Sequence, residues 1–106
     1  MTVIDTRRLP VIERKRGWYG RYFNSPSMTF GHYEFDEGAE IGAHDHVQEE
    51  VWHVIEGRLE ITIGPSTYVA EPGFVAIVPP NTTHAVKALT PGRAIVVDHP
   101  VREDLL

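Results

Sequence analysis

The fold expected of this chain is decided by residues 38–57, GAEIGAHDHVQEEVWHVIEG. This stretch places His44 and His46 two residues apart, continues to Glu50, and has a glycine at each end. Side chains alternate sides along an extended strand, so the two imidazoles point into the same space. Imidazole nitrogens suit a borderline divalent metal, and a carboxylate beyond the intervening turn would supply negative charge. The stretch therefore predicts a metal site, and the simpler alternative is a pair of surface or hydrogen-bonded histidines.

Length and composition limit the classes of protein to which the chain can belong. At 106 residues we expect one domain, residues 1–106, with no room for a second core. No apolar run is long enough to cross a bilayer, and the charged N-terminus contains no signal peptide, so we expect a cytoplasmic protein with no membrane partner. A net charge of −5 argues against a nucleic-acid partner, since phosphate contacts need clustered Lys and Arg. The absence of cysteine leaves histidine and carboxylate as the ligands for any metal.

Short alternating segments separated by Gly and Pro turns predict an all-β protein. Residues 1–17 show no period and predict an extended arm, and residues 28–98 predict the core of a barrel. The run FVAIV at residues 74–78 is wholly apolar, which predicts a strand covered on both sides. Strands regularly spaced in this way are typical of a sandwich or jelly roll. The remaining expected strands are residues 18–23, 28–35, 58–63, 67–70, 83–89 and 93–98.

Two stretches resemble the paired motifs of the cupin superfamily, whose members fold as a jelly-roll barrel (a double-stranded β-helix). The first is Gly38, five residues, His44, one residue, His46, three residues, Glu50, six residues and Gly57. The second is Gly73, five residues, Pro79, Pro80, Asn81, two residues, His84, three residues and Ala88. Asn81 and Ala88 depart from the glycine and asparagine of the pattern, although asparagine tolerates the positive φ that a glycine would adopt. The resemblance implies a divalent metal (Zn, Ni, Mn or Fe) bound by His44, His46, Glu50 and His84.

Neighbouring residues supply candidates for the walls of the site. Trp52 has the strand parity of Glu50 and is expected to wall the cavity or to pack in the core. Phe30 and His32 lie on a strand expected to flank the cavity, with their inward orientation left open. A one-residue bulge would exchange Glu49 for Glu50 as the ligand.

Chemistry at such a centre requires a group that transfers protons. Asp98 is the first candidate and His99 the second, although Asp98 can equally cap the turn before Pro100. The final segment, DHPVREDLL, is partly similar to the ending of the small cupins of pectin and alginate degradation, which linearise unsaturated uronates. That resemblance implies that Arg102 binds a substrate carboxylate, but Val96 stands where those proteins carry a catalytic aspartate.

Three functions remain open from the sequence. The leading hypothesis is a metal-dependent enzyme that acts on a compact carbonyl- or hydroxyl-bearing small molecule by redox-neutral isomerisation, ring opening or cyclisation. An iron-dependent dioxygenase and a non-catalytic metal- or ligand-binding module are the alternatives. Exposed sheet edges in so small a barrel also predict a homodimer.

Overall fold

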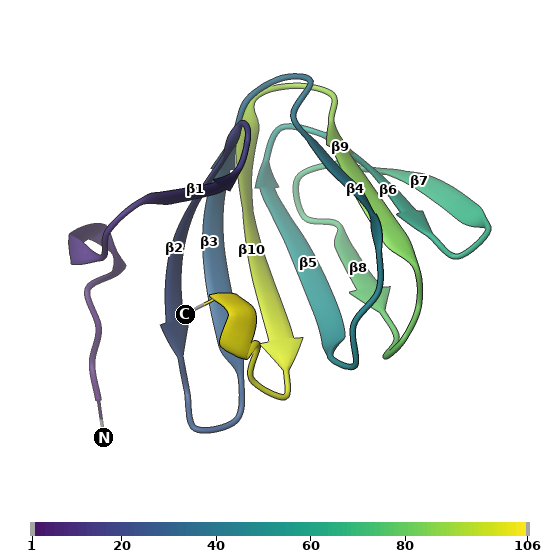
Figure 1. Ribbon diagram of the computed structural model, residues 1–106. Coiled ribbons are helices and arrows are strands. Elements are labelled where there is room, and N and C mark those ends of the chain that lie inside the picture. Colours follow the sequence, from purple (N-terminus) through teal and green to yellow (C-terminus); the bar gives the residue numbers. More distant parts are fainter. Residues whose placement is uncertain (1, 106) are drawn as a thin grey trace.

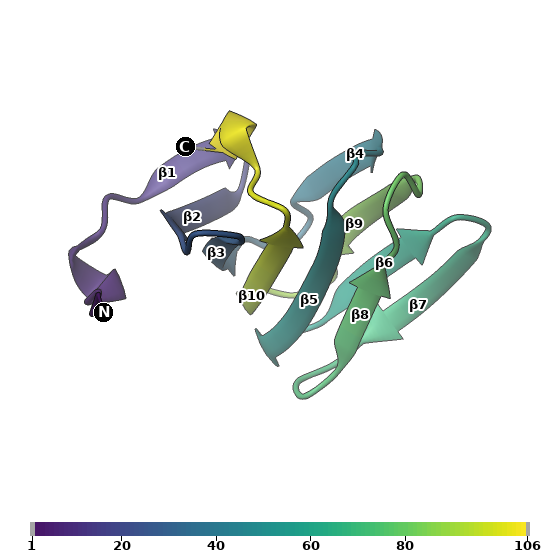
Figure 2. The same cartoon turned by 90° about the horizontal axis from the view of Figure 1, so that it is seen from below.

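The computed structural model describes residues 2–105 as ten strands in two antiparallel sheets, which confirms the predicted all-β jelly roll. The larger sheet has the order β1-β2-β3-β10-β5-β8 and the smaller β4-β9-β6-β7, and the two curve around a common interior (Figures 1 and 2). No helix of the described residues has the length and apolar character needed to cross a membrane. The strands are β1 (Ile12–Lys15), β2 (Trp18–Asn24), β3 (Thr29–Phe35), β4 (Glu40–His44), β5 (Glu49–Glu56), β6 (Leu59–Ile63), β7 (Ser66–Ala70), β8 (Val75–Val78), β9 (His84–Ala88) and β10 (Gly92–His99).

The core lies between the two sheets and follows from the alternation of the strands. The even-numbered positions 50–54 of β5 and 94–98 of β10 are buried while the residues between them are more exposed, as expected for strands with one face inward. Aromatic rings fill part of the interior, where Trp18 packs edge-on against Tyr33 and Trp52 with centroid distances of 6.0 and 5.8 Å. These rings border the polar side chains that form the site described below.

Two expectations from the sequence are corrected by the structure. Residues 1–17 are only partly an extended arm: they contain the 3₁₀ turn η1 (Thr6–Arg8) and strand β1, which pairs with β2. All four residues of β1 are exposed, so backbone pairing forms this strand without an apolar pattern that could predict it. Residues 74–78 are not covered on both sides, because β8 is an edge strand whose outer face is open. Phe74, Val75 and Ile77 are 52%, 54% and 59% exposed.

The two motif loops are joined at Asn81. Its φ of 57° is the left-handed conformation that the sequence pattern assigns to glycine, and asparagine adopts it readily. In this conformation the Asn81 N–H donates to the carbonyl of His46 at 2.8 Å. The turn before β9 is thereby fastened to the loop after β4, so the histidines of both motifs face the same space.

Candidate metal centre

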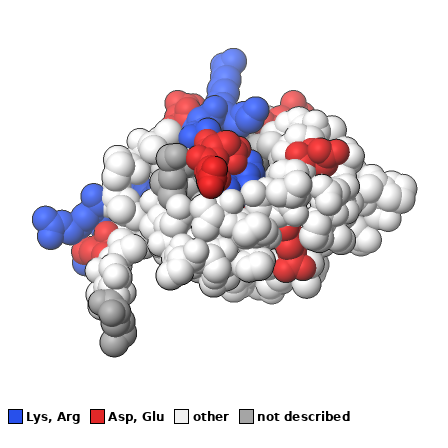
Figure 3. All heavy atoms as spheres, turned by 60° about the horizontal axis from the view of Figure 1, so that its bottom comes forward, with Lys and Arg blue, Asp and Glu red and all other residues white. Residues whose placement is uncertain are grey.

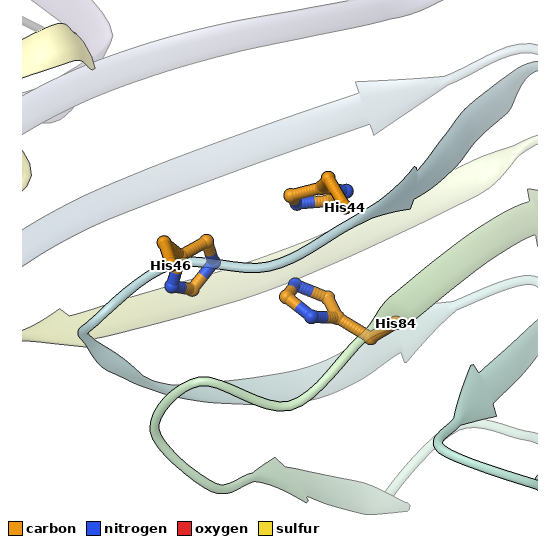
Figure 4. Close-up of side chains that lie close together, drawn as sticks. All are labelled: His44, His46 and His84. Carbon is orange, nitrogen blue, oxygen red and sulfur yellow. The ribbon is translucent and has the colours of Figure 1, made fainter.

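Three histidines from separate segments converge inside the barrel, as Figure 4 shows. His44 ends β4, His46 lies in the loop that follows, and His84 begins β9 directly opposite His44 in the β4–β9 pairing. One ring nitrogen of each histidine lies within 4.8 Å of the others. The pairing of β4 with β9 sets His44 opposite His84, and the hydrogen bond from the Asn81 N–H to the His46 carbonyl ties the third histidine to the same turn.

Each imidazole is oriented by a hydrogen bond through its other nitrogen. The Nδ1 atoms of His44, His46 and His84 lie 2.8, 3.1 and 2.8 Å from the carbonyl oxygens of residues 42, 48 and 82. A carbonyl only accepts, so Nδ1 must carry a proton, and in the neutral ring Nε2 keeps its lone pair. Three Nε2 atoms therefore point inward as ligands, in the arrangement by which proteins fix metal-binding imidazoles.

Glu50 completes the group and shows why the set fits a cation. Its two carboxylate oxygens lie 3.3 Å from His46 Nε2 and 3.0 Å from His84 Nε2, and both nitrogens are buried without a hydrogen-bond partner among residues 2–105. A neutral Nε2 lone pair and a carboxylate oxygen are both acceptors, so neither can satisfy the other. A positive centre placed between them would do so, and imidazole with carboxylate is a donor set that divalent metals accept.

Burial and neighbouring groups act in opposite directions on the pKa values of Glu50 and His84. Burial by itself would raise the pKa of Glu50, but the surrounding imidazoles, Asp98 and the Trp52 indole hold it well below its usual value. Burial lowers the pKa of His44. Burial also acts to lower the pKa of His84, but the Glu50 carboxylate outweighs it and raises that pKa. Glu50 thus remains a carboxylate at neutral pH and can balance a cation.

Asp98 lies beside Glu50, because the two residues are directly paired on β10 and β5. The Asp98 side chain is 2% exposed, and burial, followed by the negative charge of Glu50, raises its pKa to about 8. Its Oδ1 atom is buried without a hydrogen-bond partner among the described residues. His46, Glu50 and Asp98 also form a second group whose ligand atoms lie within 4.8 Å of one another. The site therefore contains one ionised carboxylate and one carboxyl group that retains a proton at neutral pH.

Arg102 reaches the two carboxyl groups from the C-terminal segment. Its Nη1 atom lies 3.6 Å from a carboxylate oxygen of Glu50 and 3.7 Å from one of Asp98. Its Nε and Nη2 atoms donate to the Asp104 carboxylate at 2.9 and 2.8 Å. The Arg102 N–H donates to the buried Thr29 hydroxyl at 2.8 Å, which fixes the segment that carries it. Figure 3 shows basic and acidic side chains gathered together in its upper centre and a largely uncharged surface below them. Arg102 thus places a fixed positive charge at the edge of the site.

These groups line a cavity of ≈ 690 Å³. Trp52 forms part of its wall and donates from Nε1 to Glu50 Oε2 at 2.7 Å, and both side chains lie on the inner face of β5. Tyr22 and Tyr33 also line the cavity, although the sequence analysis missed them. Each has a glycine two residues before it, where a Cβ would meet the ring at 2.5 and 2.8 Å, and this Gly-x-Tyr repeat is the signal that could have found them.

Three of the predicted site residues lie elsewhere. Phe30 and His32 point to the outer face of the larger sheet, because the inner positions of β3 are those of Thr29, Gly31, Tyr33 and Phe35; the expectation that they line the cavity is wrong. His99 is exposed and lies one residue beyond the inward-facing Asp98, so its parity also directs it outward. The structure places the other candidates, His44, His46, Glu50, His84, Asp98, Trp52 and Arg102, around the cavity or in it.

A family model that describes the cupin domain matches residues 31–99. The chain belongs to the cupin family. It is 33% identical over 81 residues to an uncharacterised protein of Streptomyces coelicolor, an alignment that covers 73% of this chain and 77% of the relative. The family match confirms the resemblance drawn from the two motifs.

Solved structures show the same fold. An RmlC-like cupin from Shewanella frigidimarina aligns over 100% of this cupin and 96% of its own chain, with a TM-score of 0.93 and 23% identity. KdgF from a Halomonas species aligns over 100% and 99% of the two chains, with a TM-score of 0.92 and 22% identity. Salicylate 1,2-dioxygenase from Pseudoaminobacter salicylatoxidans aligns over 78% of this cupin and 27% of its own chain, with a TM-score of 0.73 and 18% identity. At these identities the likeness concerns the fold alone.

Proposed function

We propose that this cupin is a metal-dependent enzyme that acts on a compact carbonyl- or hydroxyl-bearing small molecule without a net change of oxidation state. The reaction class is isomerisation, ring opening or cyclisation, with Asp98 as the proton-transfer group. The observation that carries the proposal is the presence, in one cavity, of three converging imidazole nitrogens and a neighbouring carboxyl group whose pKa is raised to about 8. Lewis-acid chemistry needs the first feature and proton transfer needs the second.

The metal would be held by His44, His46 and His84 through Nε2, with Glu50 as the carboxylate ligand. Their fit is supported by the two buried Nε2 atoms that have no hydrogen-bond partner within residues 2–105 and by the backbone carbonyls that orient the rings. A divalent metal bound there would polarise a carbonyl or hydroxyl oxygen of the substrate. The Glu50 carboxylate would lower the net positive charge of the metal centre, and the Trp52 indole holds one oxygen of Glu50 in place.

Asp98 would give and retrieve the proton. At neutral pH its raised pKa leaves a substantial fraction of the carboxyl group protonated, and Oδ1 is buried without a hydrogen-bond partner in the part of the chain that the structure describes. Groups that titrate near the working pH are the most effective in general acid–base catalysis. Val96 lines the same cavity two residues earlier, at the position where the uronate-linearising cupins carry aspartate, so Asp98 would act from one inward position further along β10.

Arg102 would bind an anionic group of the substrate. It is the cation nearest the two carboxyl groups, and its side chain is 13% exposed. Its Nε and Nη2 atoms already hold Asp104 through two parallel hydrogen bonds, so Nη1, which lies 3.6 Å from Glu50 and 3.7 Å from Asp98, is the group that would contact a substrate carboxylate. A small hydroxy or keto acid, such as an unsaturated uronate, presents both the oxygen for the metal and the carboxylate for Arg102.

The test compares Asp98→Asn with the wild-type protein on an unsaturated monouronate, followed by the loss of ultraviolet absorbance of its carbon–carbon double bond. We expect kcat to fall by about 10²–10⁴-fold, the usual contribution of a positioned acid or base, while the bound metal per chain stays unchanged. The matched control is Glu34→Gln, the same carboxyl-to-amide change at an exposed position of β3, which should leave kcat unaltered.

Other outcomes separate the alternatives. Full activity in Asp98→Asn would remove the proton-transfer role. Consumption of oxygen during turnover by an iron-loaded protein would instead establish a dioxygenase. Saturable binding of uronates and related hydroxy acids with no product from any of them would leave a binding module and refute the proposed enzyme.

A further inference from the structure

Two consecutive basic side chains of strand β1, Arg14 and Lys15, line the cavity that contains the metal site. In a regular strand, neighbouring side chains point to opposite sides, so only one of the two would face the cavity. The pairing of β1 with β2 sets Glu13 opposite Tyr19 and Lys15 opposite Trp18, which leaves Arg14 as an extra residue in β1. Such a β-bulge re-aims the side chains around it. The bulge therefore allows both cations to face the same space.

The hairpin that carries these two residues is fastened to the larger sheet. The Glu13 carboxylate accepts a hydrogen bond from the Gly17 N–H at 2.9 Å, and the Gly17 carbonyl accepts one from the Asp36 N–H at 3.0 Å. Gly17 has a φ of 82°, a left-handed conformation that a glycine adopts without strain. Arg14 and Lys15 therefore extend toward the cavity from a fixed backbone.

The positive charges of Arg14 and Lys15 are not neutralised by the part of the chain that the structure describes. Neither residue forms an ion pair with a carboxylate of residues 2–105, and the Arg14 guanidinium donates only to the backbone carbonyl of Asp104. The Asp104 carboxylate is already held by Arg102. Asp45 lines the cavity too but pairs with neither cation. Uncompensated charge of one sign in a cavity attracts a ligand of the opposite sign.

These two cations lie apart from the metal ligands. β1 is an edge strand of the larger sheet, whereas β4 and β9, which carry His44 and His84, belong to the smaller one. Figure 2 shows β1 beside the C-terminal turn η2 (Glu103–Leu105), with the interior of the barrel between them and β4 and β9. Burial raises the pKa of Tyr22 on β2, and the charge of Arg14 partly opposes this rise, which agrees with a position on the β2 side of the cavity.

The cavity is large enough for one molecule to reach both groups. Its volume of ≈ 690 Å³ falls within the roughly 300–1,000 Å³ of sites that hold drug-sized ligands. A six-carbon acid is smaller than such ligands, so its whole chain fits inside. With one end at the metal ligands and Arg102, its other end would face Arg14 and Lys15.

We propose that Arg14 and Lys15 bind a second anionic group of the substrate, a carboxylate or a phosphate at the end remote from the metal. The proposal rests on the enzymatic function proposed above, since it concerns the far end of the molecule whose near end the metal and Arg102 would bind. The substrate class narrows to hydroxy or keto acids with an anionic group at both ends. The Arg14 guanidinium suits the oxygens of a carboxylate or phosphate, and the Lys15 ammonium adds a flexible point charge.

Calorimetric titration of the full-length protein, with and without bound zinc, tests this second anion site with three probes. D-Gluconate, D-glucarate and 6-phospho-D-gluconate share one hydroxy-acid end and carry a hydroxyl, a carboxylate or a phosphate at the other. We expect the two doubly anionic probes to bind about tenfold more tightly than gluconate, the lower end of the effect of a hydrogen bond between charged groups, because both cations are exposed. Whichever of the two binds more tightly identifies the second group as a carboxylate or a phosphate.

Three variants show whether this preference comes from the second anion site. The double variant Arg14→Gln with Lys15→Gln should bind all three probes equally. Lys15→Gln alone leaves the contact of Arg14 with the C-terminal segment intact and should reduce the preference to about threefold, half of the free energy of a tenfold preference. The matched control is Arg16→Gln, the same loss of charge at an adjacent exposed residue that does not line the cavity, and it should retain the full preference. Thermal melts check that each variant folds.

The proposal would be overturned if neither doubly anionic probe bound, or if the wild type bound all three probes equally. A preference that survives in the double variant would place the second anion elsewhere. Equal losses in Arg16→Gln and Lys15→Gln would attribute the preference to net charge rather than to the cavity. Failure of the proposed function gives a different result. If the preference were present and sensitive to Lys15→Gln but the same with and without zinc, and the unsaturated monouronate were not turned over, the chain would bind doubly anionic ligands without being the proposed enzyme.

Discussion

Replacing Trp52 with phenylalanine tests whether the indole positions Glu50 for the metal. Trp52 is 3% exposed, and its Nε1 donates to Glu50 Oε2 at 2.7 Å. Phenylalanine retains an aromatic ring that can pack against Trp18 and Tyr33 but has no N–H group. A hydrogen bond to a charged group contributes about 1.5–3 kcal/mol, and Glu50 is too buried for water to replace the lost donor freely.

The chain contains a matched control for this change. Trp18 is 1% exposed and packs in the same aromatic cluster, but its Nε1 is buried without a hydrogen-bond partner among the residues that the structure describes. Trp18→Phe removes a similar volume from the same region without breaking a hydrogen bond. The difference between the two variants therefore isolates the contact with Glu50 from the loss of packing.

Two measurements follow from this comparison. In urea unfolding of the metal-free protein, Trp52→Phe should lose about 1.5–3 kcal/mol more free energy of unfolding than Trp18→Phe. In competition with a chromogenic chelator, the zinc affinity of Trp52→Phe should fall by about 10–100-fold, the usual effect of removing a residue that orients a ligand, while Trp18→Phe retains its affinity. Equal losses in both variants, in stability and in affinity, would show that the indole does not position Glu50.

Three further predictions concern other parts of the chain. His84→Ala should abolish stoichiometric metal binding, measured by elemental analysis after dialysis, and retention of one metal per chain would exclude His84 as a ligand. Gly57→Ala should lower the melting temperature by several degrees, because φ is +80° and a Cβ would meet a neighbouring backbone carbonyl, whereas Gly42→Ala has open space and should melt like the wild type. Asp104→Asn should reduce the loss of stability on acidification below pH 4. The hydrogen bond from Arg102 lowers the pKa of Asp104, so the ion pair stabilises the fold above the unfolded pKa of 3.8. This stabilisation is lost as the pH falls through the lower pKa that Asp104 has in the folded state. Because the Asp104 side chain is 63% exposed, we expect a difference of at most about 0.5 kcal/mol in pH-dependent urea unfolding, and identical pH profiles would contradict the ion pair.

The sequence by itself determined the fold and the group of candidate ligands. Alternating strands between Gly and Pro turns predict a jelly roll, since a residue period of two needs no information from distant parts of the chain. The resemblance of two motifs to those of cupins implied four ligands, His44, His46, Glu50 and His84, and the structure brings these side chains together. Turn chemistry was predictable too, because the positive φ at Asn81 is a local property of the backbone.

Only the tertiary structure decided which face of each strand is the inner one. Parity shows that Phe30 and His32 share a side of β3, but the pairing of β3 with β2 and β10 sets that side outward. The raised pKa of Asp98 likewise arises from tertiary structure: first from burial, and then from the negative charge of Glu50, which is distant in sequence and becomes a direct neighbour through the β5–β10 register. Strand β1 is formed by its pairing with β2, and its four exposed residues carry no apolar pattern from which the strand could be predicted. Local patterns record which residues alternate, whereas register between distant strands fixes what each residue faces.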